Sequence, residues 1–409
     1  MNLDEQVALL MQGTQYGDEQ IKQTMAAELR ERLLEGRPLR VYCGYDPRTT
    51  DLHLGHTITM RKLRQFQELG HDVTFLIGTY TSLIGDPSDK DKVRPVLTPE
   101  EVECNAQTYA EQAFKILDRE KTKVRYNAEW LAPLTFGDLI KLGSVFTVQQ
   151  FLARDMFRQR RDRGDPIYLH ETFYALMQGY DAVAQETDVQ VGGTDQLFNI
   201  IVAGRKLQEA FGQKPQVGII MGMLPGTDGV VKMSKSLGNH IPILASAEDM
   251  YGKVMSVPDK AMPHYFRLVT RWTPAHVAEI EEAMRSGRLP TASTLHPMEA
   301  KKKLAWEIVD VFHGSEAANR AAEHFERVHQ RGKLPTDIPQ FALTQPINIV
   351  DLIAEVGLAP SKSQARRLIQ QGGVRLDGER VQDIGLLVPA EEAVLQVGKR
   401  LFMRLVLGK

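Results

Sequence analysis

The stretch LRVYCGYDPRTTDLHLGH, residues 39–56, decides how this chain folds. Its bulky run VYC suits a short buried strand, and the pair DP then breaks that strand. Residues 54–69 carry apolar side chains at helical spacing, and Gly70 follows as a stop. The stretch therefore predicts a strand, a polar loop and a helix that opens with HLGH.

The HLGH string places two histidines around a glycine at the start of that helix. A helix start offers unpaired N–H groups and the positive end of the helix dipole, which suits phosphate oxygens. Gly55 lets a nucleotide approach the backbone, and the imidazoles of His53 and His56 can donate hydrogen bonds to a pentavalent phosphorus. Such a match arises by chance in roughly a few per cent of chains, so the string alone is a moderate signal.

A second string, KMSKS at residues 232–236, follows the glycine-bearing turn PGTDG. Its placement predicts a mobile loop, and the Gly238-Asn239 pair beyond it allows the loop to swing. Lys232 and Lys235 are spaced to close over a triphosphate and to neutralise the charge on a departing pyrophosphate. A lysine pair in a loop is usually only a solvated surface, but the whole pentapeptide together with HLGH indicates ATP chemistry.

The two strings together resemble HIGH and KMSKS, the signatures of the class I aminoacyl-tRNA synthetases. The first string departs from its signature by Leu54 in place of the usual isoleucine, which is an apolar exchange. The resemblance implies that the chain makes an acyl-adenylate from ATP.

Length and composition fit such an enzyme. With 409 residues the chain is long enough for two or three domains, and its formal net charge of −2 means that an RNA contact needs local basic patches. Two cysteines make no disulfide framework and indicate a reducing cytoplasm. We expect no secretory signal, because the N-terminus lacks a cationic lead, and no membrane span, because no apolar stretch approaches roughly 20 residues.

The order of patterns along the chain predicts its architecture. Short apolar runs at residues 73–78, 124–126 and 217–221 alternate with amphipathic segments, which predicts an α/β domain with a Rossmann-like, doubly wound parallel sheet. Helical patterns follow from about residue 241, and a proline-rich, polar stretch precedes the final module. We expect a Rossmann-like catalytic domain over 1–240, an α-helical, anticodon-binding domain over 241–335, a linker over 336–345 and a small α+β domain over 346–409.

The final module joins a basic helix to a hairpin. Ser361 is a candidate cap for a helix over residues 362–371, a glycine pair would stop it, and the Asp-Gly pair at 377–378 is a strong hairpin signal. A solvated helix face is the competing interpretation. The unit resembles the S4-type RNA-binding fold, which implies that basic side chains grip an RNA backbone, and these are Lys362, Arg366, Arg367, Arg375 and Arg380.

The segment FYALMQGYD, residues 173–181, carries information about the amino-acid substrate. Tyr174, Gln178 and Asp181 fall at i, i+4 and i+7 on a helix, so three polar groups point the same way. Because the other positions are largely apolar or aromatic, we expect this polar stripe to line a pocket. The string VQVGGTDQ at residues 189–196 then predicts a strand whose terminal glycines let a nucleotide lie against the backbone.

These strings resemble the tyrosyl-tRNA synthetases, and the S4-like module agrees with their bacterial form. The resemblance implies that Tyr42 and Asp181 bracket the phenol of tyrosine, with Asp181 accepting its hydroxyl proton. It implies further tyrosine contacts from Asp86, Tyr174 and Gln178 to the ammonium group and from Gln196 near the carboxylate. The ATP site would consist of Cys43, Asp46, Gly55, Thr59, Gly193, Asp195 and Lys235, and the catalytic residues would be His53, His56, Lys232 and Lys235.

The resemblance also implies the partners of the reaction. They are L-tyrosine, Mg-ATP and tRNA(Tyr), brought together in the cytoplasm, with no tightly bound, protein-ligated metal. A homodimer would form through an insertion in the sheet domain. One departure concerns the mobile loop, since many bacterial tyrosine enzymes carry KFGKT there and this chain keeps KMSKS.

Three other functions remain open from the sequence. Tryptophanyl-tRNA synthetases share both signatures, but an indole pocket would not be expected to combine Tyr42 with Asp181. An RNA-binding protein with an inactive synthetase fold would not need both lysines and both histidines, and a nucleotidyltransferase for a small cofactor precursor would not need the terminal module.

For the basic residues 154–163, contact with the tRNA acceptor arm and a solvated helix face weigh equally.

Overall fold

The structure is a computed structural model of the chain and describes residues 1–47, 52–87, 98–286, 296–330, 338–398 and 401–407. Its contacts divide the chain into two compact units, Met1–Ala322 and Glu323–Lys409, each with its own hydrophobic core. No helix among the described residues is long and apolar enough to cross a membrane.

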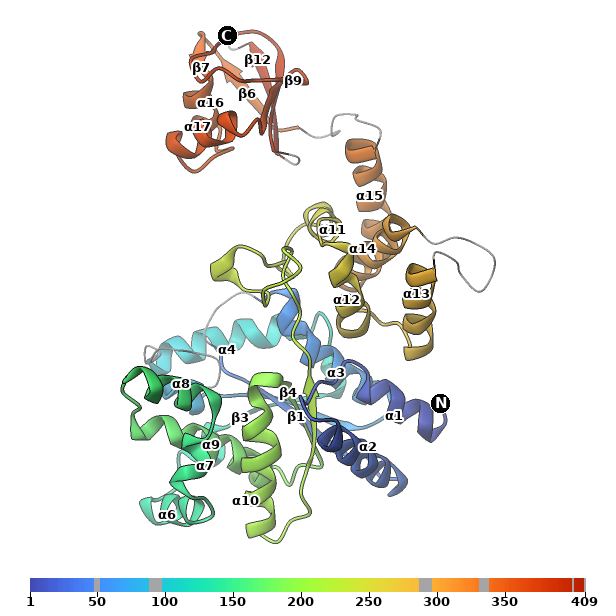
Figure 1. Cartoon of the computed structure of the whole chain (residues 1–409), viewed down its shortest axis with the longest axis vertical. Helices are drawn as coiled ribbons and strands as arrows, with labels where there is room; N and C mark the ends of the chain where they lie inside the picture. Colours follow the sequence, from blue (N-terminus) through green and yellow to red (C-terminus); the bar gives the residue numbers. More distant parts are fainter. Residues whose placement is uncertain (48–51, 88–97, 287–295, 331–337, 399–400, 408–409) are drawn as a thin grey trace. The chain divides into compact units, whose positions relative to one another are not determined.

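The first unit is built on a five-stranded parallel sheet in the order β3-β2-β1-β4-β5 (Figure 1). Its strands are β1 (Arg40–Tyr45), β2 (Asp72–Ile77), β3 (Thr122–Tyr126), β4 (Val189–Gly193) and β5 (Val217–Met221). Adjacent strands run parallel, and the strand order reverses between β1 and β4. In open sheets of this kind, ligands bind beyond the carboxyl ends of the strands where the order reverses. The predicted Rossmann-like, doubly wound sheet is confirmed.

Helices cover both faces of this sheet (Figure 1). The helix that opens with HLGH is split into a 3-10 turn, η1 (Leu54–His56), and α3 (Thr57–Glu68), which packs its apolar side on β1, β2 and β4. Further helices of the sheet domain, short 3-10 turns aside, are α1 (Leu3–Met11), α2 (Glu19–Leu34), α4 (Pro99–Ala113), α5 (Ala128–Leu131), α6 (Phe136–Ser144), α7 (Val148–Leu152), α8 (Asp155–Arg163), α9 (Leu169–Ala184), a π-helical segment η5 (Phe198–Gly204) and α10 (Arg205–Ala210).

A buried carboxylate ties α2 to the sheet. Asp188 precedes β4, and 2% of its side chain is exposed. It accepts hydrogen bonds from Arg32 (3.0 Å), from Arg37 (2.7 Å) and from the backbone N–H of Arg40 (2.8 Å). A buried charge is tolerated when it is paired and hydrogen-bonded in this way. The cluster lies at the amino ends of β1 and β4, so it leaves the opposite, ligand-binding edge open.

Beyond the sheet the first unit continues with helices alone in its described part. The α-helices of this part are α11 (Ala247–Met255), α12 (Met262–Val269), α13 (Pro274–Ser286), α14 (Pro297–His313) and most of α15 (Ser315–Phe325), which ends beyond Ala322. Met250 and Val254 of α11 are fully buried and pack with α14, where Leu304 and Ile308 are also fully buried. The predicted helical domain is confirmed, while its boundaries at residues 241 and 335 stay predictions.

The second unit is a small α+β domain. Its main sheet has the order β6-β12-β11-β8-β9, and a second sheet pairs β10 with β7. Its elements are β6 (Gln340–Leu343), β7 (Ile347–Asn348), α16 (Ile349–Glu355), α17 (Lys362–Gln370), β8 (Val374–Leu376), β9 (Glu379–Arg380), β10 (Leu387–Val388), β11 (Ala393–Val397) and β12 (Leu401–Leu407). Ser361 caps α17 by accepting the N–H of Gln364 (3.2 Å), as predicted. The hairpin at Asp377 (φ 49°) and Gly378 (φ 86°) is also present.

The predicted linker over residues 336–345 differs from the structure in its second half. Residues 336 and 337 lie outside the described residues, but Gln340–Leu343 forms β6 and pairs in parallel with β12. Leu343 is buried in the core of the second unit, and Phe341 packs against that core. The prolines and polar residues of this segment suggested a linker. It forms an edge strand because its two apolar side chains pack into or against the core.

Candidate active site

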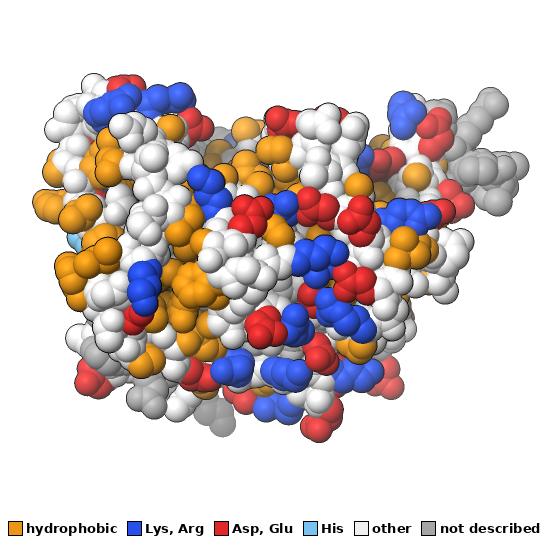
Figure 2. Space-filling model, turned by 90° about the horizontal axis from the view of Figure 1, so that it is seen from below, with side chains coloured by type: hydrophobic (Ala, Val, Ile, Leu, Met, Phe, Trp, Pro, Cys, Tyr) orange, Lys and Arg blue, Asp and Glu red, His pale blue; other side chains and the backbone are white. Residues whose placement is uncertain are grey.

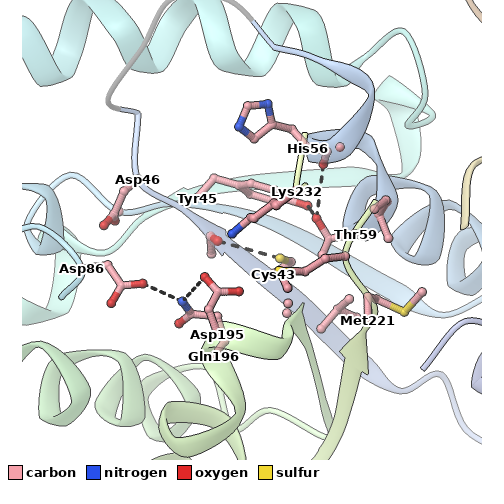
Figure 3. Close-up of a pocket in the computed structure, with 18 of the residues that line it drawn as sticks. Cys43, Tyr45, Asp46, His56, Thr59, Asp86, Asp195, Gln196, Met221 and Lys232 are labelled. Carbon is pink, nitrogen blue, oxygen red and sulfur yellow. Dashed lines mark hydrogen bonds between the residues drawn. The ribbon is translucent and has the colours of Figure 1, made fainter. Parts of the chain in front are cut away.

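A cavity of about 790 Å³ opens at the carboxyl ends of β1, β2, β4 and β5. It brings together side chains that the sequence separates by almost two hundred positions (Figure 3). Its lining includes each residue that the sequence assigned to catalysis or to small-molecule binding, namely Tyr42, Cys43, Asp46, His53, Gly55, His56, Thr59, Asp86, Tyr174, Gln178, Asp181, Gly193, Asp195, Gln196, Lys232 and Lys235. The placement is shown, and the individual roles stay predictions.

The two histidines of HLGH lie with ring centroids 3.7 Å apart. Nδ1 of His56 accepts the N–H of His53 (3.1 Å), and Nδ1 of His53 accepts the N–H of Gly55 (3.2 Å). Each neutral ring therefore carries its proton on Nε2. Burial, together with the smaller effect of nearby Lys235 and Lys232, lowers the pKa of His53 to about 2 and that of His56 to about 4. At neutral pH both rings are uncharged donors, and the lysines supply the positive charge.

We predict that neither histidine titrates in the folded protein between pH 5.5 and 8. Their pKa values are lowered in the fold, so their contribution to stability is present above pH 6.5 and is lost as the pH falls toward 4. The check is an NMR pH titration of the histidine Cε1–H signals, assigned with H53N and H56N. A midpoint near 6.5 for either signal would contradict the assignment of neutral rings.

The carboxyl group of Asp181, on α9, is 3% exposed. It accepts hydrogen bonds from Nε1 of Trp130 (2.7 Å) and Nδ2 of Asn127 (3.4 Å). Burial nevertheless raises the pKa of Asp181 to about 8, because these two bonds do not replace its lost hydration. Tyr42, 1% exposed, lies beside it and donates its hydroxyl to the carbonyl oxygen of Gln178 (3.4 Å). This end of the cavity suits a ligand hydroxyl that donates to a carboxylate.

A chain of amide hydrogen bonds fixes the two glutamines of the cavity. Asn199, fully buried on η5, donates from Nδ2 to Oε1 of Gln178 (2.9 Å) and to Oε1 of Gln196 (3.0 Å). Gln196 in turn donates to Asp86 (2.5 Å) and to Asp195 (3.2 Å), as Figure 3 shows. Asn199 therefore sets the orientation of both amides.

Asp46 connects the predicted tyrosine and nucleotide parts of the cavity. One of its oxygens accepts the hydroxyl of Tyr174 (2.9 Å), and the other accepts the hydroxyl of Thr81 (2.8 Å). A Cβ atom at Gly78, directly after β2, would come within 2.2 Å of this carboxylate, so any larger residue would displace it. The sequence placed Asp46 with the nucleotide, whereas its hydroxyl partners also join it to the tyrosine side.

The predicted nucleotide side of the cavity carries neutral groups from β1 and α3. Cys43 is 4% exposed, and burial raises the pKa of its thiol to about 12, so the thiol stays protonated. The hydroxyl groups of Tyr45 and Thr59 are hydrogen-bonded to each other (2.8 Å). Figure 3 shows Lys232 reaching into the cavity between His56 and the pair Asp195 and Gln196. A polyanion entering here would meet the cationic lysines and the N–H donors of the histidines beside these neutral groups.

The predicted RNA-binding residues of the second unit are all exposed: Lys362, Arg366, Arg367, Arg375 and Arg380. Three of them have local partners. Lys362 pairs with Asp351 (3.0 Å), Arg375 donates to the carbonyl oxygen of Gly378 (2.9 Å), and Arg380 donates to that of Gln371 (3.4 Å). These contacts leave the side chains at the surface, where a phosphate can reach them.

The basic residues 154–163 do not form one surface. Arg154 is 9% exposed, and its guanidinium lies 4.6 Å from the ring centroid of Phe198. Arg160 is 2% exposed and forms a buried ion pair with Glu171. The side chains of these two arginines are therefore buried in the protein. A solvated helix face or a contact with the tRNA acceptor arm remains possible only for the other arginines of α8.

Several residues of the site were not identified from the sequence, and three of them hold its predicted functional side chains. Trp130 and Asn127 hold Asp181, and the string NAEW around them has no pattern that signals a site. Asn199 did carry a usable signal, because it follows Gln196 by three positions and so shares a side of the helical turn with it.

Comparison with known proteins identifies the family. Residues 34–330 match the family described as tRNA synthetases class I (W and Y), and residues 348–394 match the S4 domain. The tyrosine–tRNA ligase of Thermotoga maritima is 49% identical over 383 residues, which are 93% of this chain and 94% of that protein. The tyrosine–tRNA ligase of Moorella thermoacetica is 48% identical over 407 residues, which are 98% and 97% of the two chains.

Solved structures show the same fold. The crystal structure of tyrosyl-tRNA synthetase complexed with L-tyrosine from Archaeoglobus fulgidus superposes with a TM-score of 0.59 at 22% identity, covering 78% of this chain and 100% of that chain. The family match spans most of the chain, and the relatives above align along nearly their full length. The chain therefore belongs to the class I tRNA synthetases (W and Y) and, within them, to the tyrosine–tRNA ligases.

Proposed function

We propose that the cavity forms tyrosyl-adenylate from L-tyrosine and ATP, the first step of the tyrosine–tRNA ligase reaction. The observation that carries the proposal is that HLGH, KMSKS and the buried Asp181 carboxyl line one cavity. Asp181 and Tyr42 bracket the phenol, and Asp86, Tyr174 and Gln178 receive the ammonium group. Gln196 lies near the tyrosine carboxylate. This arrangement directs the carboxylate toward the nucleotide side of the cavity.

The proposed step is an in-line displacement at phosphorus. An oxygen of the tyrosine carboxylate bonds to the α-phosphorus, the bond from that phosphorus to the bridging oxygen breaks, and pyrophosphate leaves. Nε2–H of His53 and of His56 donates to the phosphate oxygens, and Lys232 and Lys235 neutralise the leaving group. No side chain acts as a nucleophile, so catalysis consists of positioning and charge stabilisation. Magnesium enters as Mg-ATP, part of the substrate.

In the second proposed step a ribose hydroxyl of the 3′-terminal adenosine of tRNA(Tyr) attacks the tyrosyl carbonyl carbon, and AMP leaves. The five basic residues of the second unit would hold the tRNA backbone, since phosphate contacts dominate such binding. We place the reaction in the cytoplasm, in agreement with two cysteines that are both free thiols.

The ammonium assignment can be tested by comparing tyrosine with 3-(4-hydroxyphenyl)propionate, which lacks the amino group. D86N should lower the affinity for tyrosine by about 10- to 100-fold, because a charge-assisted hydrogen bond is lost. The affinity for the desamino compound should stay the same or increase. Isothermal titration measures both, and equal losses for the two ligands would move Asp86 away from the ammonium group.

We also propose a homodimer formed through the helices α6 to α9. Large apolar side chains are exposed there, namely Phe136 (77%), Ile140 (59%), Val148 (69%), Tyr168 (49%) and Leu169 (73%). Figure 2 shows hydrophobic side chains gathered toward one edge of the molecule. A second copy of the chain is the proposed occupant, because a two-fold interface buries the same patch on both subunits. α9 begins in this patch and carries Tyr174, Gln178 and Asp181 into the cavity.

The dimer predicts the behaviour of charged variants. I140E and L169E should each convert the protein to a single chain in sedimentation velocity, because a buried unpaired carboxylate is strongly unfavourable at an interface. L34E is the matched control, since Leu34 is 66% exposed at the end of α2, outside the patch, and this variant should remain a dimer. A wild-type protein that sediments as one chain would overturn the dimer.

A further inference from the structure

Two side chains that have no role above join the ends of the signature loop, which we define as residues 225–239. Asp228 precedes the KMSKS string, and Asn239 follows it. Nδ2 of Asn239 donates to Oδ2 of Asp228, and Oδ1 of Asn239 accepts the N–H of Ser234 (2.8 Å). Asn239 is 5% exposed, so this contact is shielded from water.

The same pair holds the backbone on both sides of Lys232. Oδ1 of Asp228 accepts the N–H of Val230 (2.7 Å) and of Val231 (2.8 Å). Nδ2 of Asn239 also lies 3.4 Å from the carbonyl oxygens of Val231 and Lys232. With these contacts, both arms of the loop are fastened to one buried amide.

The backbone around this pair is built to receive it. The N–H of Thr227 donates to the carbonyl oxygen of Asn239 (2.9 Å), and the N–H of Gly226 donates to that of Val231 (2.8 Å). A Cβ atom at Gly226 would come within 2.3 Å of the Asn239 amide, so glycine leaves the space that this amide fills. The sequence predicted that Gly238 and Asn239 let the loop swing, but the structure shows Asn239 fastened in place.

We propose that Asp228 and Asn239 form a clasp that positions Lys232 and Lys235 for the triphosphate. Neither clasp residue lines the cavity, whereas both lysines do, so Asp228 and Asn239 are positioning residues. A lysine side chain is flexible, and the backbone that carries it decides where its ammonium can reach. The inference rests on the proposed role of the two lysines in adenylate formation.

Donor and acceptor complementarity across the clasp provides the test. D228N sets an amide N–H₂ against the Asn239 N–H₂, and N239D sets two carboxylates against each other, so each single variant loses the contact. Each should lower kcat for tyrosine-dependent pyrophosphate exchange by about 10-fold or more, since small misplacements of catalytic groups are costly. KM for tyrosine should not change. The double variant D228N/N239D places a donor opposite an acceptor again and should recover to within about threefold of wild type.

Two further variants separate the possible outcomes. N319A removes an asparagine that bonds Nε1 of Trp306 (2.8 Å) outside the cavity, and it should exchange at the wild-type rate. If K235A exchanges at the wild-type rate, the proposed role of the lysines fails. If K235A is slow while D228N and N239D are as fast as wild type, the clasp is overturned. A folded double variant that exchanges about 10-fold or more slowly than wild type also overturns it, and this outcome decides even when a single variant does not fold.

Discussion

Replacing Asp181 by alanine should lower kcat/KM for tyrosine by about 10³-fold or more and leave that for phenylalanine nearly unchanged. Asp181 is 3% exposed and is the proposed acceptor for the phenol hydroxyl. Without it a bound tyrosine would bury its hydroxyl without that partner, while phenylalanine would lose nothing. Tyrosyl-tRNA synthetases select tyrosine over phenylalanine by about 10⁵-fold without editing. The size of the effect expected here is taken from that general property of the enzyme class.

Pyrophosphate exchange with both amino acids measures this change in preference. D181N keeps one acceptor oxygen and should fall between wild type and D181A. Because burial raises the pKa of Asp181 to about 8 and the phenol donates to the ionised form, the affinity for tyrosine should increase from pH 6 to pH 8. That increase should be absent in D181A. An unchanged preference for tyrosine in D181A would remove Asp181 from the specificity site.

K235A should slow adenylate formation by about 10²-fold or more while tyrosine binding hardly changes. Lys235 lines the cavity together with the HLGH histidines, which are neutral, so the positive charge that neutralises the leaving pyrophosphate must come from the lysines. Stopped-flow measurement of the first turnover, with tyrosine affinity from equilibrium titration, separates the two effects.

The control for K235A is K214A. Lys214 is 55% exposed, pairs with Glu35 (3.0 Å) and lies outside the cavity, so its loss should leave the first turnover unaltered. A K235A protein with the wild-type rate would show that the triphosphate does not need this charge.

Local patterns were sufficient to predict much of the fold and many of the residues that line the cavity. Residues within a few positions of one another determine three of these features. They are the strand at VYC, the helix that carries Tyr174, Gln178 and Asp181, and the hairpin at Asp377. In each of the two signatures the residues expected to act on ATP lie within one contiguous string, so their spacing can be recognised directly in the sequence. Each of these features formed where the sequence predicted it.

Features that depend on tertiary contacts were not predictable in this way. Trp130 and Asn127 reach Asp181 from a segment about fifty positions away, and no local pattern announces them. The sequence suggested that Arg154 and Arg160 belong to a basic surface. In the structure Arg154 lies over the ring of Phe198, and Arg160 pairs with the buried Glu171. Asn239 read as a flexible residue because only the folded loop brings Asp228 to it.

The most direct test of the whole account is amino-acid-dependent exchange of pyrophosphate into ATP by the intact protein, run in parallel with tyrosine, tryptophan and phenylalanine. Exchange is expected with tyrosine and essentially none with the other two, because only tyrosine would both fill the proposed pocket and donate a hydroxyl proton to Asp181. Exchange with tryptophan alone, or with none of the three, would contradict it.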